Sequence, residues 1–262
     1  MRIKLTLRAV NEKTSIPLNY NHAVSAMIYK TVAESSPEFA EELHERGFMS
    51  ENRQFKLFTF SRIETKAAFV DRSASRIVLN NPYVNLQVSS PVAEFLNNFV
   101  RGLFARQSFR IDKAEFVLAD SETLDEPEFS EEMHFRALSP ITEAVRNKEN
   151  KIEYLTPKDD WSELITRNLR RKYEAFYGVS LRNADVELIW DKNYFADERN
   201  YKRAAKLIAL PNKNNPREPI KVRGWLAPFT LRGNVALIKL GFETGFGNKN
   251  SMGFGMARVS TN

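Results

Sequence analysis

The chain has 262 residues, of which 42% are hydrophobic and 11% aromatic, enough for one large globular domain or two small ones. It contains no cysteine, which excludes disulfides and thiolate metal sites. No apolar run approaches the ~20 residues of a membrane span, so we expect a cytoplasmic protein without a membrane contact. The three histidines, His22, His44 and His134, are too dispersed to indicate a metal cluster.

The net charge of +6 is unevenly distributed along the chain. Residues 1–130 hold 16 Lys and Arg against 17 Asp and Glu, whereas residues 131–262 hold 23 against 16. An excess confined to one half suggests a polyanionic partner, although charge alone favours an ordinary solvated basic surface. Basic residues cluster at several places in the second half. The candidate contacts to a polyanion in these clusters are Arg167, Arg170, Arg171, Arg203 and Arg223.

The first half of the chain predicts the order β-α-β-β-α-β. Alternating apolar residues predict a strand over Ile3–Val10, and a helix follows from His22 to about Ala33 with Asn21 as its N-cap. This order, with an inserted short helix, is the ferredoxin-like pattern. The remaining predicted elements are a short helix over Pro37–Glu45, strands over Phe55–Phe60, Arg76–Leu79 and Tyr83–Val88, a helix over Pro91–Phe104 and a strand over Phe109–Leu118.

An acidic segment separates the two halves. Seven acidic residues and no basic one lie between Asp120 and Glu132, with Pro127 in the middle, which is typical of a linker or an exposed edge. We therefore predict an N-terminal domain over residues 1–122 and a C-terminal domain over residues 130–262.

The second half repeats the pattern less clearly. Its predicted strands are Met133–Ala137, Ala184–Trp190, Tyr201–Ala209, Ile220–Leu226 and Phe254–Val259, and its predicted helices are Trp161–Phe176, closed by Gly178, and Asn234–Leu240. We expect an α+β fold of two tandem ferredoxin-like domains, each an antiparallel sheet with helices on one face. Such a sheet is a common RNA platform, but a fold alone does not establish a function.

The segment Gly241–Gly255, GFETGFGNKNSMGFG, contains five of the ten glycines. A Walker loop is excluded because no Gly-Lys pair occurs, and a dinucleotide fingerprint fails at its third glycine, where Asn250 stands. A glycine helix cap running into a loop and a phosphate-binding loop are about equally consistent with the segment. The candidate phosphate contacts are Gly245, Gly247, Asn248, Lys249, Asn250, Ser251, Gly253 and Gly255.

Three side chains of the first half are of the types that metal-free ribonucleases use for proton transfer and charge stabilisation. His44 ends a short acidic helix, where the helix dipole alone also explains a histidine. Tyr29 lies outside the apolar stripe of its helix, available for a ligand or for packing under a neighbouring element. Lys56 lies at the start of a predicted strand, where a lysine is ordinarily an exposed gatekeeper. His22 shares the Tyr29 face; its position at the helix start favours capping or surface exposure over contact with a substrate.

Several motifs together resemble one known family. The glycine-rich GFGNKNSMGFGMARV resembles the signature of the CRISPR-associated endoribonucleases that process precursor CRISPR RNA, the Cas-six family. The stretches PLNYNHAVSAMIY, LHERGF and FKLFTFS resemble that family as well, so the similarity covers essentially the whole chain. One departure is a longer segment, GFMSENRQF, between His44 and Lys56.

The resemblance implies an activity and its site. The family's catalytic group corresponds to Tyr29 in IYK, His44 in LHERG and Lys56 in FKLFTFS, with His22 as a reserve candidate. It implies cleavage of the CRISPR repeat without a metal or a cofactor, leaving a 2′,3′-cyclic phosphate and a 5′-hydroxyl. It also implies that the glycine loop and the basic second half bind RNA, and that other CRISPR complex subunits or a second copy of the chain are possible partners. The alternatives are a repeat-RNA binder or scaffold that does not cleave, and a small-molecule enzyme on the same fold.

Overall fold

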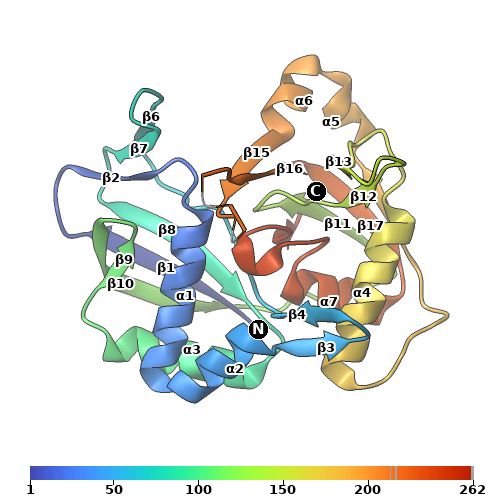
Figure 1. The fold of residues 1–262 in the computed structure, drawn as a ribbon, viewed down its shortest axis with the longest axis horizontal. Helices are drawn as coiled ribbons and strands as arrows, with labels where there is room; N and C mark the ends of the chain where they lie inside the picture. The colour runs from blue at the N-terminus through green and yellow to red at the C-terminus, as the bar shows by residue number, and fades with distance from the viewer. Residues whose placement is uncertain (213, 216, 261–262) are drawn as a thin grey trace.

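The computed structural model describes residues 1–212, 214–215 and 217–260. Its centre consists of two antiparallel sheets, one from each half of the chain. Figure 1 shows the first half, in blue and green, beside the second half, in yellow to red. In the described part of the chain, no helix has the length and apolar character to cross a bilayer.

The first sheet has the strand order β5-β8-β1-β10-β9. Read along the chain, its four main strands give the order second, third, first, fourth, which is the ferredoxin-like arrangement. Helices α1 and α3 pack together so closely that a Cβ on Gly102 would lie 1.8 Å from the Thr31 carbonyl oxygen. The elements are β1 (Arg2–Ala9), α1 (Asn21–Ser35), α2 (Pro37–Glu45), β5 (Thr59–Phe60), β8 (Tyr83–Ser89), α3 (Ala93–Ala105), β9 (Phe109–Ile111) and β10 (Ala114–Leu124).

The second sheet repeats this topology, with the strand order β14-β17-β11-β18. The same order of second, third, first and fourth strand confirms the predicted pair of tandem ferredoxin-like folds. The elements are β11 (Glu132–Ala137), α4 (Ser162–Tyr177), β14 (Val186–Trp190), β17 (Pro228–Gly233), α7 (Val235–Thr244) and β18 (Ala257–Val259). We propose residues 1–122 and 130–262 as the domain bounds, although β10 extends two residues past the first of these bounds.

Smaller elements extend both halves. The first half adds a three-stranded sheet, β2 (Thr14–Pro17), β7 (Arg76–Leu79) and β6 (Ala68–Asp71), and a hairpin, β3 (Phe48–Ser50) and β4 (Arg53–Phe55). The second half adds the hairpin β12 (Ala144–Arg146) and β13 (Ile152–Tyr154), the pair β15 (Ala205–Leu210) and β16 (Ile220–Trp225), the short helices α5 (Lys192–Ala196) and α6 (Glu198–Ala204), and a 3-10 turn, η1 (Asn250–Met252).

Several helix boundaries follow directly from local sequence signals. Helix α2 spans the predicted residues because Ser36 accepts a hydrogen bond from the Phe39 amide and Pro37 occupies the first turn. Gly178, with φ 71°, ends α4 in the left-handed conformation, as expected. The side chain of Asn234 caps α7.

Four predicted strands are wrong in extent. In Phe254–Val259 only Ala257–Val259 is strand, because Gly255 has φ 84°. The predicted strand Phe55–Phe60 is broken between β4 and β5. At the break, Leu57 has φ 50°, and Leu57 and Phe58 are buried. Phe109–Leu118 is the hairpin β9–β10, because the chain turns at Asp112 with φ 59°. The first part of Tyr201–Ala209 belongs to α6, which is capped by Asp197.

The predicted N-cap role of Asn21 is also wrong. Helix α1 starts at Asn21 itself, and no side chain caps it. The Asn21 amide instead donates to the carbonyl oxygen of Met252, 2.8 Å away, in the glycine-rich segment of the other half. The polar side chain at the first residue of the helix therefore makes a contact between the two halves.

The first strand also ties the halves together. Arg2 is buried, and its guanidinium donates to the carbonyl oxygens of Ala257 and Phe242, at 2.8 and 2.9 Å, across the junction. The terminal ammonium of Met1 lies 3.2 Å from the Glu243 carboxylate. Burial lowers the Arg2 pKa to about 9, with Glu243 opposing the shift. These contacts fix how the two sheets face one another.

Candidate active site

The structure brings the three predicted catalytic side chains to one place, the C-terminal end of α2. The Tyr29 ring on α1 meets the His44 ring edge-on, with ring centroids 5.4 Å apart. The Lys56 ammonium donates to the Leu43 carbonyl oxygen at 2.7 Å and also to that of His44. The reserve candidate, His22, is exposed on the first turn of α1, about two helical turns from Tyr29.

The longer segment between His44 and Lys56 forms the hairpin β3–β4, which returns Lys56 to the end of α2. The turn into the hairpin needs Gly47, because it has φ 57° and a Cβ there would lie 2.5 Å from the Phe55 carbonyl oxygen. The far end of the hairpin contacts α4 of the second half, where Glu51 pairs with Arg171 at 2.7 Å (Figure 1). The insertion thus contributes to the junction of the two halves.

The environments of Tyr29 and His44 differ. Tyr29 is half-buried and also packs edge-on against Phe58, and this burial raises its pKa above the usual value. The His44 side chain is 54% exposed, and its Nδ1 lies 3.1 Å from a Glu45 carboxylate oxygen. The site therefore combines a phenol that stays protonated with an imidazole that solvent and a substrate can reach.

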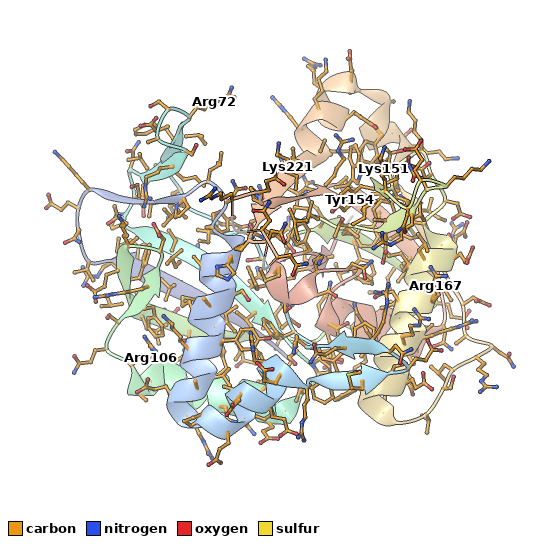
Figure 2. All side chains as sticks on the ribbon, viewed as in Figure 1. Arg72, Arg106, Lys151, Tyr154, Arg167 and Lys221 are labelled. Carbon is orange, nitrogen blue, oxygen red and sulfur yellow. The ribbon has the colours of Figure 1, made fainter. Side chains whose placement is uncertain are left out.

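Lys56 lines a cavity of about 680 Å³ between the two halves. Phe55, Lys56 and Phe58 form the first-half wall, and the hairpin β12–β13 lies on the second-half side. Figure 2 shows Lys151 and Tyr154 of this hairpin, with Arg167 on α4. The exposed part of the glycine-rich segment, Asn248 to Ser251, completes the lining.

The glycines themselves face protein. Gly245, Gly247, Gly253 and Gly255 are buried with positive φ, and a Cβ on Gly253 would lie 2.3 Å from the Phe60 ring. The amides of Gly245, Gly253 and Gly255 donate to carbonyl oxygens within the chain. The segment packs the two halves together, and Lys249 is its exposed cation. Asn250 donates to the Phe254 carbonyl oxygen at 3.0 Å.

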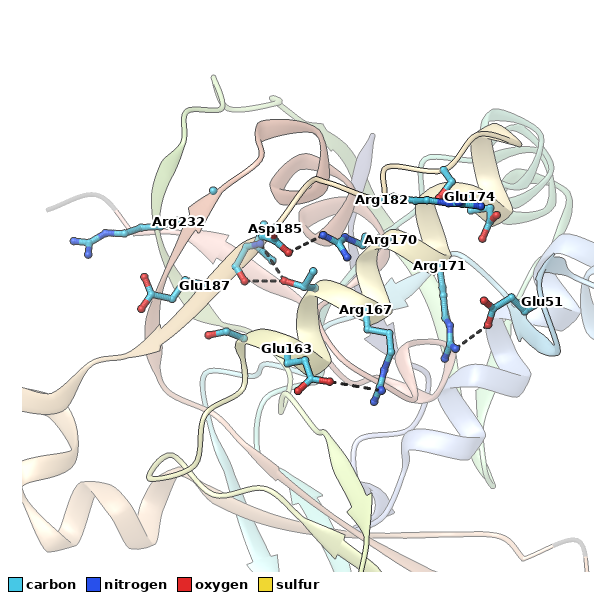
Figure 3. Close-up of a pocket in the computed structure, with 15 residues that line it drawn as sticks. Glu51, Glu163, Arg167, Arg170, Arg171, Glu174, Arg182, Asp185, Glu187 and Arg232 are labelled. Carbon is cyan, nitrogen blue, oxygen red and sulfur yellow. Dashed lines mark hydrogen bonds and ion pairs between the residues drawn. The ribbon is translucent and has the colours of Figure 1, made fainter.

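The predicted arginines do not form one patch. Arg167, Arg170 and Arg171 line a groove of about 880 Å³ along α4, shown in Figure 3. Each pairs with an acid there, at 3.9 Å from Glu163, 2.7 Å from Asp185 and 2.7 Å from Glu51, respectively. Arg223 is exposed on β16, and Arg203 belongs to a different cavity.

That other cavity, of about 380 Å³, holds four arginines that come from both halves, Arg62, Arg136, Arg203 and Arg258. Among its lining residues that the structure describes, Glu64 is the single acid. Arg136 and Arg258 stand directly opposite each other on β11 and β18, a like-charge pair that is unfavourable without an anion. Sequence reasoning missed three of the four, because alternation places an arginine on a strand face but does not give the register between strands.

The fold and site define a class: two tandem ferredoxin-like folds with a Tyr–His–Lys cluster beside an interdomain cavity. Two family models cover this chain in succession. The model described as "CRISPR-associated protein Cas6, N-terminal" matches residues 15–122, and "CRISPR associated protein Cas6, C-terminal" matches residues 124–259. The chain belongs to the Cas6 family, which confirms the resemblance drawn from its motifs.

The names of similar curated proteins are consistent with this family. A CRISPR-associated endoribonuclease Cas6 of Methanocaldococcus jannaschii is 30% identical over 260 residues, covering 98% of this chain and 91% of the relative. One of Pyrococcus furiosus is 27% identical, covering 99% and 89%. A solved structure of a Cas6-related gene product from Pyrococcus furiosus covers 100% of this chain and 99% of its own, with 24% identity and a TM-score of 0.80, which supports the fold.

Proposed function

We propose that the protein is an endoribonuclease that cuts precursor CRISPR RNA within each repeat without a metal ion. The observation that carries the proposal is the meeting of Tyr29, His44 and Lys56 at the end of α2, where Lys56 also lines the cavity between the halves. The names of the curated relatives support the same activity. The expected products carry a 2′,3′-cyclic phosphate and a 5′-hydroxyl.

The environments of the three groups suggest their roles. His44, whose side chain is exposed, accepts the proton of the RNA 2′-hydroxyl while the 2′-oxygen attacks the adjacent phosphorus. Tyr29, whose raised pKa keeps the phenol protonated, donates a proton to the departing 5′-oxygen as the P–O bond breaks. Lys56 stabilises the negative charge that develops on the phosphorane oxygens. Exchange with solvent then removes the proton that His44 accepted and returns a proton to the Tyr29 phenolate.

We assign RNA binding to three surfaces. Lys249, Asn250 and Ser251 extend from the glycine-rich segment into the cavity that Lys56 lines. The four-arginine cavity supplies four cations against one acid among its described lining residues, and the arginines of α4 supply more charge at their ion-paired groove. Phosphate contacts of this kind predict an affinity that falls steeply with salt.

The test is incubation of the purified protein with its CRISPR repeat RNA in EDTA. We expect a single cut per repeat with a cyclic phosphate on the upstream product, read by mass spectrometry and by resistance of that end to ligation. A cut that requires added Mg²⁺, or an upstream product with a 3′-hydroxyl, would contradict the proposal.

A repeat-RNA binder that does not cleave is the second candidate. The Lys56 ammonium already donates to two α2 carbonyl oxygens, a structural use that needs no catalysis. A second Pyrococcus furiosus relative, 26% identical, is named an endoribonuclease-like protein. Tight binding of uncut repeat RNA in the same assay supports this candidate, and light scattering of the complex tests assembly with a second copy or other CRISPR subunits.

A further inference from the structure

Two aromatic rings, one from each half of the chain, line the same cavity as Lys56. Phe55 belongs to β4 and Tyr154 to β13, and both side chains are half-buried. Within the described part of the chain, neither ring stacks on or meets another aromatic ring. Aromatic surface in a basic cavity is the arrangement that binds the bases of single-stranded nucleic acids.

Tyr154 shares one face of the hairpin β12–β13 with Arg146 and Ile152. The register pairs Arg146 with Ile152 and Ala144 with Tyr154, and residues opposite each other, or two apart on one strand, point to the same side. Ile152 is 54% exposed, and Arg146 is exposed as well. The hairpin therefore presents a cation, an aliphatic side chain and a ring on one surface, and all three line the cavity.

The Tyr154 ring is supported by the second half of the chain. It packs against a small apolar cluster formed by Leu210, Val222 and Phe254. Burial raises the Tyr154 pKa above its usual value, so the phenol is uncharged at neutral pH. A supported, neutral ring loses little freedom when a flat group covers it, which lowers the entropic cost of stacking.

Basic side chains line the cavity together with the two rings. Arg53, Arg146 and Lys249 are exposed, and within the described residues none of the three forms an ion pair. Among the described lining residues, Glu143 is the single acid, and it is buried. Cations beside aromatic rings fit the alternation of phosphates and bases along an RNA strand. The charge therefore favours RNA over an apolar peptide as the occupant.

We propose that Tyr154 stacks on an RNA base beside the scissile phosphate, in a subsite for unpaired nucleotides. An internal base of a duplex is covered on both faces by its neighbours, so only an unpaired base can turn a face to the ring. Every base has an aromatic face, so the subsite selects for the absence of pairing and not for the identity of the base. The inference rests on the proposed function, because it places the base beside the phosphate that Lys56 is proposed to contact.

The probe is the CRISPR repeat RNA with its 2′-hydroxyls methylated, which cannot be cut, and fluorescence anisotropy measures its binding. We expect Tyr154→Ala to weaken binding about tenfold, whereas Tyr154→Phe, which keeps the ring, should stay within about twofold of the wild type. Tyr83→Ala removes a ring that is 45% exposed on β8, outside the described lining of the cavity, and should bind like the wild type. Because stacking neutralises no phosphate, Tyr154→Ala should keep the wild-type slope of log Kd against log salt, whereas Lys249→Ala should lower that slope by about 1.

A scan with abasic nucleotides locates the stacked base. One base of the probe is removed at a time, and the cut is mapped in EDTA on the unmethylated RNA. We expect removal of a base that flanks the cut to weaken wild-type binding about tenfold and to leave the already weakened binding of Tyr154→Ala unchanged. Tyr154→Leu, which keeps an apolar side chain against the cluster, gives the same test should Tyr154→Ala not fold.

The outcomes separate the two proposals. If the wild type binds and cuts the repeat, but removal of each flanking base costs Tyr154→Ala as much as it costs the wild type, the subsite is wrong while the function stands. Binding by Tyr154→Phe as weak as that by Tyr154→Ala would overturn the subsite as well. If the wild type does not cut the repeat, the proposed function fails and the subsite fails with it.

Discussion

At the residue scale, Tyr29 illustrates what a helical wheel can predict. Its position outside the apolar stripe predicts a ring available for a ligand or for a neighbouring element, and the structure places the ring against His44 and Phe58. The helical wheel could not predict the burial that raises the Tyr29 pKa, because the His44 and Phe58 rings that pack against it lie outside its helix. Only the family resemblance predicted that Tyr29, His44 and Lys56 belong to one site.

Lys172 is a buried cation that the sequence analysis did not single out. Its basic neighbours, Arg170 and Arg171, suggest a solvated face, yet it lies three and seven residues after the buried Leu169 and Ile165. That helical spacing is the signal that would have placed it in the core stripe. Burial lowers the Lys172 pKa to about 7, with Glu143 opposing the shift.

This pKa predicts a pH dependence of stability. Because the folded pKa lies below the unfolded value of 10.5, the unfolded chain binds more protons between about pH 7 and 10.5, and stability rises with pH across that window. Lys172→Met should remove this rise, so the variant's free energy of unfolding should fall further below that of the wild type as pH increases from 7 to 10. Urea unfolding at a series of pH values measures the difference, and a difference independent of pH would contradict the assignment.

At the element scale, the backbone geometry of the glycine-rich segment was predictable from its sequence, but its packing partners were not. Five glycines in fifteen residues predict special backbone geometry, and positive φ values at Gly245, Gly247, Gly253 and Gly255 confirm that need. The sequence could not predict which parts of the protein pack against these glycines. The approaching groups are Phe60 of the first half and the backbone near Pro140 and Thr142.

Gly253→Ala tests this packing. Its Cβ would lie 2.3 Å from the Phe60 ring at φ 75°, so we expect a loss of stability of about 2 kcal/mol or more. Gly178→Ala is the matched control, because it has a similar φ of 71° but open space around its Cβ, and should cost about 1 kcal/mol. Equal losses in urea unfolding would show that backbone strain, not the approach of Phe60, explains the glycine.

At the scale of the whole molecule, the order of strands and helices predicted the first sheet and the tandem repeat, but not the central strand β17 of the second sheet, and the predicted strands near β15 and β16 form a separate pair. The contacts between the halves were not predictable either. The excess charge of the second half predicts where a polyanion binds, but the cavities draw their lining from both halves. Arg62 and Arg258 meet only through the tertiary fold, and Asn21 turned out to reach across the junction. Residues far apart in sequence can be assigned to one site only after the sheets are placed.

The central claim is that the Tyr29, His44 and Lys56 cluster cleaves RNA. Single-turnover cleavage of repeat RNA in EDTA by His44→Ala tests it most directly, with His22→Ala as the control on the same RNA. The account predicts that His44→Ala slows cleavage about 100-fold or more while the dissociation constant for RNA changes little. A wild-type rate in His44→Ala, or a loss confined to His22→Ala, would contradict it.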